Sequence, residues 1–231
     1  MARDPREARV ASWTMGTLFP AEPVTVAPGA VHLPGWLRIE SQRELVGRCR
    51  DWVRACGGMR HHRTPRGGTM SVGMASLGWY WEPYRYSATL PDGTPVPALP
   101  ALLGELARSG VAAAFGDEAA ESQPPYDVAL INFYGPEAKM GMHQDREERC
   151  AAPVVSLSLG DTCVFRFGNT ETRSRPYTDV ELRGGDLFVF GGAARMAYHG
   201  VPRTRPGTAD PATGLESGRL NITIRASGLS A

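Results

Sequence analysis

The chain has 231 residues, which is enough for one sizeable domain and too few for two of ordinary size. Hydrophobic residues make up 42% and charged residues 21%, a balance that excludes a chain disordered as a whole. The net charge of +1 excludes a uniformly basic nucleic-acid coat but allows a local basic patch. Because the sequence has no run of about 18 apolar residues and no secretory h-region, we expect a soluble, cytoplasmic protein without a membrane partner.

The N-terminal part of the chain predicts a tail, a short strand and a helix. Residues 1–16 have no periodic pattern and predict a flexible tail, and a short strand is expected at 30–33. Ser41 and Glu44 have the spacing of a capping box, and apolar residues then recur at helical intervals. The Gly-Gly pair at 57–58 is expected to end this helix.

The remainder predicts one more helix and then a series of strands. A basic run at 60–66 predicts a loop, residues 70–74 a strand, and leucines at helical spacing a helix over 98–108. Short strands are expected at 128–134, 154–159, 163–167, 179–182, 187–190, 197–201 and 220–225. So many short strands predict a jelly roll or barrel with the helices packed outside. We therefore expect a single domain over 17–231 of the mixed α+β class, mainly β.

Three side chains have the types and spacing of a metal site. His143 and Asp145 form an H-x-D pair, and positions i and i+2 of an extended segment point the same way. With His199 from a later strand they make two imidazoles and one carboxylate, a set that leaves open positions on Fe(II) for a co-substrate and dioxygen. An H-x-D pair also arises often by chance, so a half-buried imidazole at His199 and a turn residue at Asp145 remain alternative interpretations.

The C-terminal strand carries a second polar pattern. Arg219, Asn221 and Arg225 have even separations and share one face of the strand, with apolar residues on the other. A solvated face is the ordinary interpretation of such a strand. On the inner wall of a barrel, however, the two arginines would need anionic partners, and a small dicarboxylate is the obvious candidate. Asn132 and Tyr134, also at i and i+2, are placed to add hydrogen bonds.

Together these residues resemble the AlkB-type branch of the Fe(II)- and 2-oxoglutarate-dependent dioxygenases. The resemblance is carried, in chain order, by the strand with Asn132 and Tyr134, the segment AKMGMHQD that ends at Asp145, the run VVSLSLG from residue 154, YHGV around His199, and LNITIR preceded by Arg219. It covers roughly residues 18–226. It implies a double-stranded β-helix core over about 126–226, N-terminal helices packed outside, and a nucleotide-recognition lid over about 58–90.

The resemblance also implies a cofactor site. Fe(II) would be bound by His143, Asp145 and His199, with 2-oxoglutarate and dioxygen as co-substrates. The 2-oxoglutarate site would use Asn132, Tyr134, Arg219, Asn221 and Arg225. In it, Arg219 would pair with the C5 carboxylate, while Arg225 and Asn132 would lie near the C1 carboxylate.

The activity that the resemblance implies is the oxidative dealkylation of N-alkylated bases, such as 1-methyladenine and 3-methylcytosine. The partner would be alkylated DNA, mainly single-stranded or with a flipped base, and the protein is expected to act as a monomer that releases an aldehyde and succinate. Two alternatives stay open. One is the same chemistry on RNA, and the other is a cupin-like metal-binding module without catalysis, in which the arginines would be structural.

On the substrate side, the resemblance implies a pocket for a flipped base. Trp79 matches the aromatic position against the base, Met74 lies in the preceding lid strand, and Glu147, where the family pattern has aspartate, would face a cationic lesion. Phosphate or lesion contacts would come from Arg63, Arg66 and Arg195, although the basic run by itself would be an ordinary solvated loop. Trp81 and Tyr86 are expected to pack inside the lid or the core.

Overall fold

The computed structural model describes residues 21–64, 67–83 and 85–229. The helices described are α2 (Ile39–Ala55), α3 (Ala101–Phe115), α4 (Asp117–Glu121) and the 3-10 turns η1 (Gly192–Ala194) and η2 (Pro211–Thr213). The strands are β1 (Val24–Ala27), β2 (Ala30–Leu33), β3 (Gly73–Leu77), β4 (Tyr80–Glu82), β5 (Arg85–Ser87), β6 (Val128–Tyr134), β7 (Met140–His143), β8 (Val154–Gly160), β9 (Thr162–Phe167), β10 (Thr178–Leu182), β11 (Leu187–Phe190), β12 (His199–Arg205) and β13 (Arg219–Arg225). The tail predicted at 1–16 lies outside the described residues.

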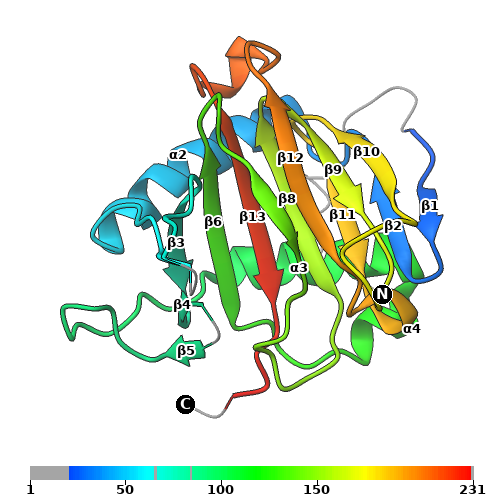
Figure 1. The fold of residues 1–231 in the computed structure, drawn as a ribbon, viewed down its shortest axis with the longest axis horizontal. Coiled ribbons are helices and arrows are strands. Elements are labelled where there is room, and N and C mark those ends of the chain that lie inside the picture. The colour runs from blue at the N-terminus through cyan, green and yellow to red at the C-terminus, as the bar shows by residue number, and fades with distance from the viewer. Residues whose placement is uncertain (1–20, 65–66, 84, 230–231) are drawn as a thin grey trace, which may run out of the picture.

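The strands form two facing antiparallel sheets and a separate hairpin. The large sheet has the order β1-β2-β11-β8-β13-β6-β3, and the small sheet has the order β10-β9-β12-β7 (Figure 1). Strands β4 and β5 pair only with each other within the described chain, and we call them the lid hairpin. Non-consecutive neighbours in both sheets are the mark of a jelly roll. The predicted double-stranded β-helix of a mainly β, mixed α+β protein is therefore confirmed.

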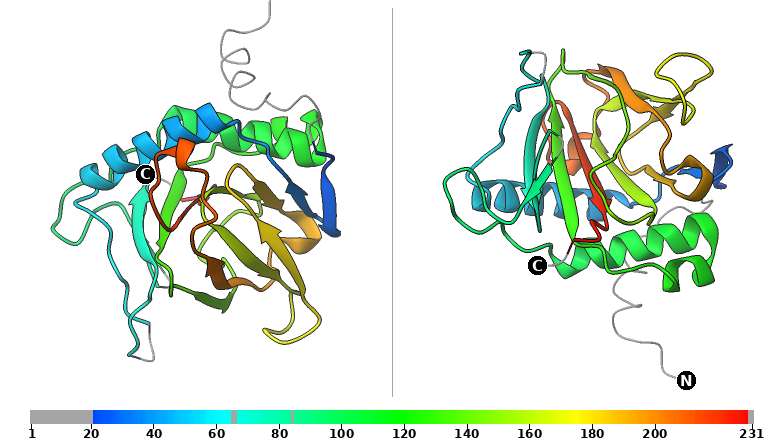
Figure 2. Two further views of the ribbon diagram at one scale, coloured as in Figure 1. Left: turned by 90° about the horizontal axis from the view of Figure 1, so that it is seen from above. Right: turned by 60° about the horizontal axis from the view of Figure 1, so that its bottom comes forward.

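Strand β13 separates an apolar layer from a polar one. Its even positions, Leu220, Ile222 and Ile224, belong to an apolar cluster with side chains of α2 and α3. Its odd positions face the space between the sheets, where they meet polar side chains of β6 and β8. Both long helices lie on one side of the molecule and the small sheet on the other (Figure 2, left). All seven residues of β13 are buried, so the alternation predicted from the sequence separates two buried environments and not core from solvent.

Helix α2 begins earlier than the sequence predicts. It starts at Ile39, and the N-cap residue Arg38 makes no side-chain cap hydrogen bond. The predicted capping box with Ser41 at the N-cap is therefore wrong, because Ser41 lies inside the first turn. The predicted end is confirmed: Gly57 and Gly58 take φ angles of 73° and 97°, which glycine adopts at little cost.

Helix α3 is longer than the predicted 98–108, because Gly110 does not interrupt it. The helix continues to Phe115 and packs on the large sheet. A Cβ atom at Gly110 would come within 2.7 Å of a methyl group of Leu187 in β11. Gly110 is thus a point of close helix–sheet approach, and packing outweighs the helix-breaking tendency of glycine.

Several strand boundaries also differ from the predictions. The strand predicted at 70–74 is β3 at Gly73–Leu77, because pairing with β6 sets its limits. The strand predicted at 197–201 is β12, which begins at His199 and continues to Arg205 along β9. No helix in the part of the chain that the structure describes is long and apolar enough to cross a membrane.

Gly78 joins the lid hairpin to β3, and we expect its replacement by alanine to destabilise the protein strongly. Its φ is +78°, and a Cβ atom would collide with the carbonyl oxygen of Asp127. Gly93, with φ +85° and open space around it, is a matched control. In urea unfolding, Gly93→Ala should cost about 1 kcal/mol for the backbone conformation. Gly78→Ala should cost clearly more, and equal losses would show that the close approach is relaxed without penalty.

Candidate metal centre and its cavity

The predicted metal ligands lie in a cavity between the two sheets. The cavity has a volume of about 660 Å³ and is lined by side chains from both sheets and from the lid hairpin. His143 ends β7, Asp145 follows it by two residues, and His199 begins β12 directly opposite His143 in the pairing of these strands. The antiparallel register of β7 and β12 thus brings the two imidazoles together.

The ligand atoms of the three side chains converge. Potential ligand atoms of His143, Asp145 and His199 all lie within 4.8 Å of one another. His143 Nε2 is 3.7 Å from Asp145 Oδ1, and His199 Nε2 is 3.8 Å from Asp145 Oδ2. Asp145 Oδ2 is buried and has no hydrogen-bond partner in the described part of the protein. A buried carboxylate oxygen without a partner is costly, and a metal ion would satisfy it.

Both imidazoles are held in the tautomer that a metal needs. His143 Nδ1 lies 2.9 Å from the carbonyl oxygen of Gly141, and His199 Nδ1 lies 3.0 Å from that of Ala197. A carbonyl oxygen only accepts, so each Nδ1 carries the proton and each Nε2 keeps its lone pair. Burial, aided by His143, lowers the pKa of His199 to about 4, so this imidazole is neutral at pH 7.

Asp145 is fixed by two buried arginines. Arg225 Nη2 lies 2.7 Å from Asp145 Oδ1, and Arg195 Nη1 donates to the backbone oxygen of Asp145 at 3.0 Å. Burial would raise the pKa of the Asp145 carboxyl, but Arg225 and the two imidazoles hold the pKa below its ordinary value. The carboxylate is therefore charged and has one oxygen left free. Two imidazoles and one such carboxylate fit Fe(II).

Arg219 has unused hydrogen-bonding capacity deep in the same cavity. Its side chain is 1% exposed, and Nη2 donates to Ser158 Oγ at 3.0 Å. Nε and Nη1 have no partner among the described residues. A buried guanidinium with unpartnered donors is costly, and a carboxylate would satisfy them with charge-assisted hydrogen bonds. This arrangement fits one end of a small dicarboxylate.

The polar wall next to Arg219 is assembled by strand register. Asn132 lies opposite Asn221 in the pairing of β6 with β13, and its Nδ2 donates to Asn221 Oδ1 at 3.1 Å. Asn221 Nδ2 in turn donates to Ser156 Oγ at 2.7 Å, while Asn132 Oδ1 has no partner within the described chain. Tyr134, opposite Arg219, lines the cavity as well. The structure therefore brings all five residues predicted for 2-oxoglutarate into one wall, although Arg225 Nη1 and Nη2 already have partners within the protein.

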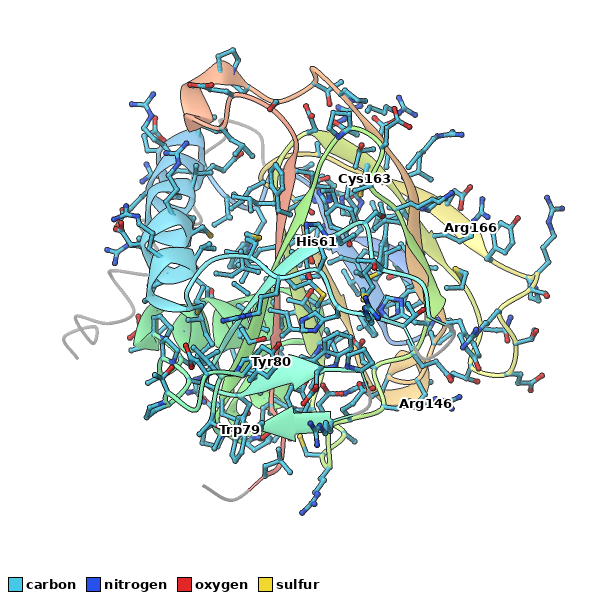
Figure 3. The ribbon with its side chains drawn as sticks, turned by 60° about the vertical axis from the view of Figure 1, so that its left-hand side comes forward. His61, Trp79, Tyr80, Arg146, Cys163 and Arg166 are labelled. Atoms are coloured by element: carbon cyan, nitrogen blue, oxygen red, sulfur yellow. The ribbon has the colours of Figure 1, made fainter. Side chains whose placement is uncertain are left out.

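On the substrate side, the structure places the two tryptophans Trp79 and Trp81 differently relative to the cavity. Trp81, in the lid hairpin, lines the cavity together with Met74 and Glu147. Trp79 lies outside that lining, and its indole N–H donates to Asp127 Oδ2 at 3.2 Å. Figure 3 labels Trp79 beside the lid hairpin. The hydrogen bond of Trp79 holds it next to the start of β6, and Trp81 is the tryptophan in the cavity lining.

Arg63 and Arg195, the two described arginines predicted to contact phosphate or the lesion, both lie outside the cavity lining. Arg195 is buried, and its donors go to Ala152 O, Asp145 O and Glu148 Oε2. Arg63 is exposed in the loop before β3, outside the cavity lining. Arg66 lies outside the described residues.

Sequence reasoning missed two residues that join the site to the lid. Glu148 forms ion pairs with Arg195 and Arg225, and Tyr86 donates to Glu148 Oε1 at 2.5 Å. The sequence feature that could have indicated Glu148 is the need of buried arginines for anionic partners. The sequence interpretation gives both arginines to a bound dicarboxylate, whereas Arg225 pairs with the protein carboxylates of Asp145 and Glu148.

Comparison with known proteins agrees with this geometry. A family model described as "2OG-Fe(II) oxygenase superfamily" matches residues 29–225. The chain is 39% identical over 212 residues to the "Alpha-ketoglutarate-dependent dioxygenase AlkB homolog" of Caulobacter vibrioides, covering 89% of this chain and 90% of that protein. It is 32% identical to the "DNA N(6)-methyladenine demethylase ALKBH1C" of Arabidopsis thaliana, covering 87% of this chain and 49% of that protein. The solved "structure of OsALKBH1" superposes with a TM-score of 0.78 at 32% identity, covering 88% of this chain and 99% of that one.

Proposed function

Because the chain belongs to the 2OG-Fe(II) oxygenase superfamily and to its AlkB-type branch, we propose that it oxidatively demethylates N-alkylated bases in nucleic acid. The observation that carries the proposal is the convergence of His143, Asp145 and His199 beside the unpartnered donors of Arg219. The protein is an Fe(II)- and 2-oxoglutarate-dependent dioxygenase that uses dioxygen as its second co-substrate. A metal-binding module without catalysis would have no use for a buried guanidinium with two free donors.

In this proposal each residue has a defined task. His143, His199 and Asp145 would hold Fe(II), which would supply the activation of dioxygen. Arg219 pairs with the C5 carboxylate of 2-oxoglutarate, and the amide groups of Asn132 and Asn221 orient the co-substrate along the wall. The apolar rings of Phe165 and Phe190, centred 5.9 and 5.0 Å from the ring of His199, fix that imidazole and exclude water from its flank.

The lid side of the cavity is suited to a flipped, alkylated base. Trp81 supplies an aromatic side chain and Met74 an apolar one, and Glu147 supplies a carboxylate to the same lining. Bases such as 1-methyladenine and 3-methylcytosine are cationic, and both a ring face and a carboxylate favour a cation. We propose these lesions as substrates, with release of an aldehyde and succinate. A flipped base is least costly to extract from single-stranded DNA, which we propose as the main substrate.

Replacement of Trp81 by leucine is expected to weaken the binding of a methylated oligonucleotide by about 1–3 kcal/mol, the range of one base–aromatic stack. Titration by fluorescence anisotropy, with Mn(II) and 2-oxoglutarate present to prevent turnover, measures the effect. Trp79→Leu is the matched control and should change affinity less, because Trp79 lies outside the cavity lining. A larger loss for Trp79→Leu would return the stacking role to Trp79.

The proposal is tested directly by aldehyde release from a panel of oligonucleotides. The panel pairs 1-methyladenine, 3-methylcytosine and N6-methyladenine with DNA and RNA, in single and double strands, with and without 2-oxoglutarate. We expect 2-oxoglutarate-dependent aldehyde release with the highest rate on single-stranded DNA carrying a cationic lesion. A higher rate on RNA would reassign the substrate, and succinate formation without any aldehyde would remove nucleic-acid demethylation. Size-exclusion chromatography tests the expected monomer.

A further inference from the structure

Glu148 connects the lid hairpin to the proposed metal site. Its carboxylate has no exposed surface. Oε1 accepts a hydrogen bond from the Tyr86 hydroxyl at 2.5 Å and from Arg225 Nη1 at 3.1 Å, and Oε2 pairs with Arg195 Nη2 at 2.9 Å. Glu148 therefore receives one partner from the lid, one from β13 and one from the turn before β12.

Arg225 extends this network to a metal ligand. One arm of its guanidinium, Nη1, donates to the Tyr86 hydroxyl at 3.2 Å as well as to Glu148. The other arm, Nη2, lies 2.7 Å from Asp145 Oδ1. Because the guanidinium is planar and rigid, the position of the first arm sets the direction of the second. The partner of Nη1 thereby affects how the Asp145 carboxylate is oriented, and with it the free oxygen Oδ2.

The charges of this network cancel within it. Arg195 and Arg225 carry two positive charges, and Asp145 and Glu148 carry two negative charges, all on buried side chains. Tyr86 is the neutral member and comes from the lid. In a buried environment, each hydrogen bond to a charged group strengthens its neighbours, and exposure to water weakens them all. Movement of Tyr86 away from Glu148 would admit water to the Arg225 pairs.

Tyr86 also shares a hairpin face with the residue beside the cavity. In the pairing of β4 with β5, Tyr86 lies directly opposite Trp81, so both side chains are on the same side of the hairpin. Trp81 lines the cavity, and Tyr86 reaches the charged network. A second lid contact, in which the backbone N–H of Trp81 donates to Ser76 Oγ at 3.1 Å, makes no hydrogen bond to the Glu148 network within the described chain.

We propose that Tyr86 is a positioning residue that couples docking of the lid hairpin to the geometry of Asp145, so that metal binding and lid docking stabilise each other. This inference rests on the proposed function, because it takes Asp145 as a metal ligand. The coupling is reciprocal: a hydroxyl that improves metal binding when the lid is docked must also make the lid dock more firmly when metal is bound.

The experiment compares Tyr86→Phe with the wild type, using Mn(II) as a probe that accepts the same imidazole and carboxylate ligands. Electron paramagnetic resonance measures Mn(II) affinity, and hydrogen exchange measures protection of the lid hairpin. We expect the dissociation constant of Mn(II) to rise about 5-fold or more in Tyr86→Phe, the lower end of usual coupling strengths. We also expect Mn(II) to slow hairpin exchange in the wild type and to lose that effect in the variant.

Ser76→Ala is the matched control, since it also removes one hydroxyl that holds the lid. It should speed hairpin exchange while leaving Mn(II) affinity and the Mn(II)-dependent slowing as in the wild type. Tyr86→Phe with unchanged affinity and unchanged slowing would overturn the inference, as would Ser76→Ala with losses equal to those of Tyr86→Phe. A wild-type protein that binds no Mn(II) would overturn the proposed function together with the inference.

Discussion

Asp145→Asn is expected to abolish turnover and to weaken metal binding by more than about 100-fold, because even residues that only support metal ligands cost 10–100-fold when changed. The amide keeps the shape of the side chain, and Asn Oδ1 or Nδ2 replaces the oxygen that now has no partner. The loss would come from the missing charge, since Arg225 lies 2.7 Å away and would then oppose a cation without compensation.

Binding of Mn(II) and succinate release at saturating 2-oxoglutarate are the measurements for this variant. Glu147→Gln makes the same chemical change in the same cavity, on a side chain that is not in the triad. It should leave Mn(II) affinity as in the wild type. Retention of wild-type Mn(II) affinity in Asp145→Asn would exclude Asp145 as a ligand, and equal losses in both variants would show only a general effect of charge.

Arg219→Met is expected to raise the KM for 2-oxoglutarate by roughly 10–100-fold, the equivalent of losing a charged hydrogen-bonded partner worth about 1.5–3 kcal/mol. At saturating 2-oxoglutarate, kcat should fall much less, because the contact lies at the far carboxylate. The protein without 2-oxoglutarate should melt at the same or a higher temperature, since methionine removes a buried guanidinium with two unpartnered donors.

Steady-state kinetics and thermal unfolding together test this prediction. Arg219→Lys keeps the charge and loses the paired N–H geometry, so its KM should lie between those of the wild type and Arg219→Met. An unchanged KM in both variants would mean that the co-substrate docks elsewhere. A large drop in melting temperature without 2-oxoglutarate would instead assign Arg219 to folding.

The sequence predicts well which side chains of β7, β12 and β13 lie together, because strand periodicity determines which face each residue occupies. Even spacing places Arg219, Asn221 and Arg225 on one face of β13, and the H-x-D pair with His199 converges where β7 and β12 pair. The partners of each charged group depend instead on contacts between distant segments. Glu148 pairs with Arg225 across 77 positions, a contact that no local pattern indicates.

The lid is predicted less fully for a similar reason. Trp79 and Trp81 are two residues apart, and spacing alone does not tell which of them lines the cavity. The hydrogen bond from Trp79 to Asp127 joins residues 48 positions apart, and no local pattern indicates it. Boundaries such as the start of α2 at Ile39 were shifted because packing against the large sheet, and not the capping sequence, determines where the helix begins.

The lid hairpin is separate from both the large and the small sheet, and this separation affects how the base preference of such a protein can change. The proposed metal ligands and co-substrate residues lie in strands of the jelly roll or directly after one, whereas Trp81 comes from a ribbon that pairs with no strand of either sheet in the described chain. New base preferences can therefore arise by altering this ribbon while the oxidising chemistry stays intact. Substitution of Tyr86 would be tolerated least, because its hydroxyl accepts a hydrogen bond from Arg225, which in turn contacts Asp145.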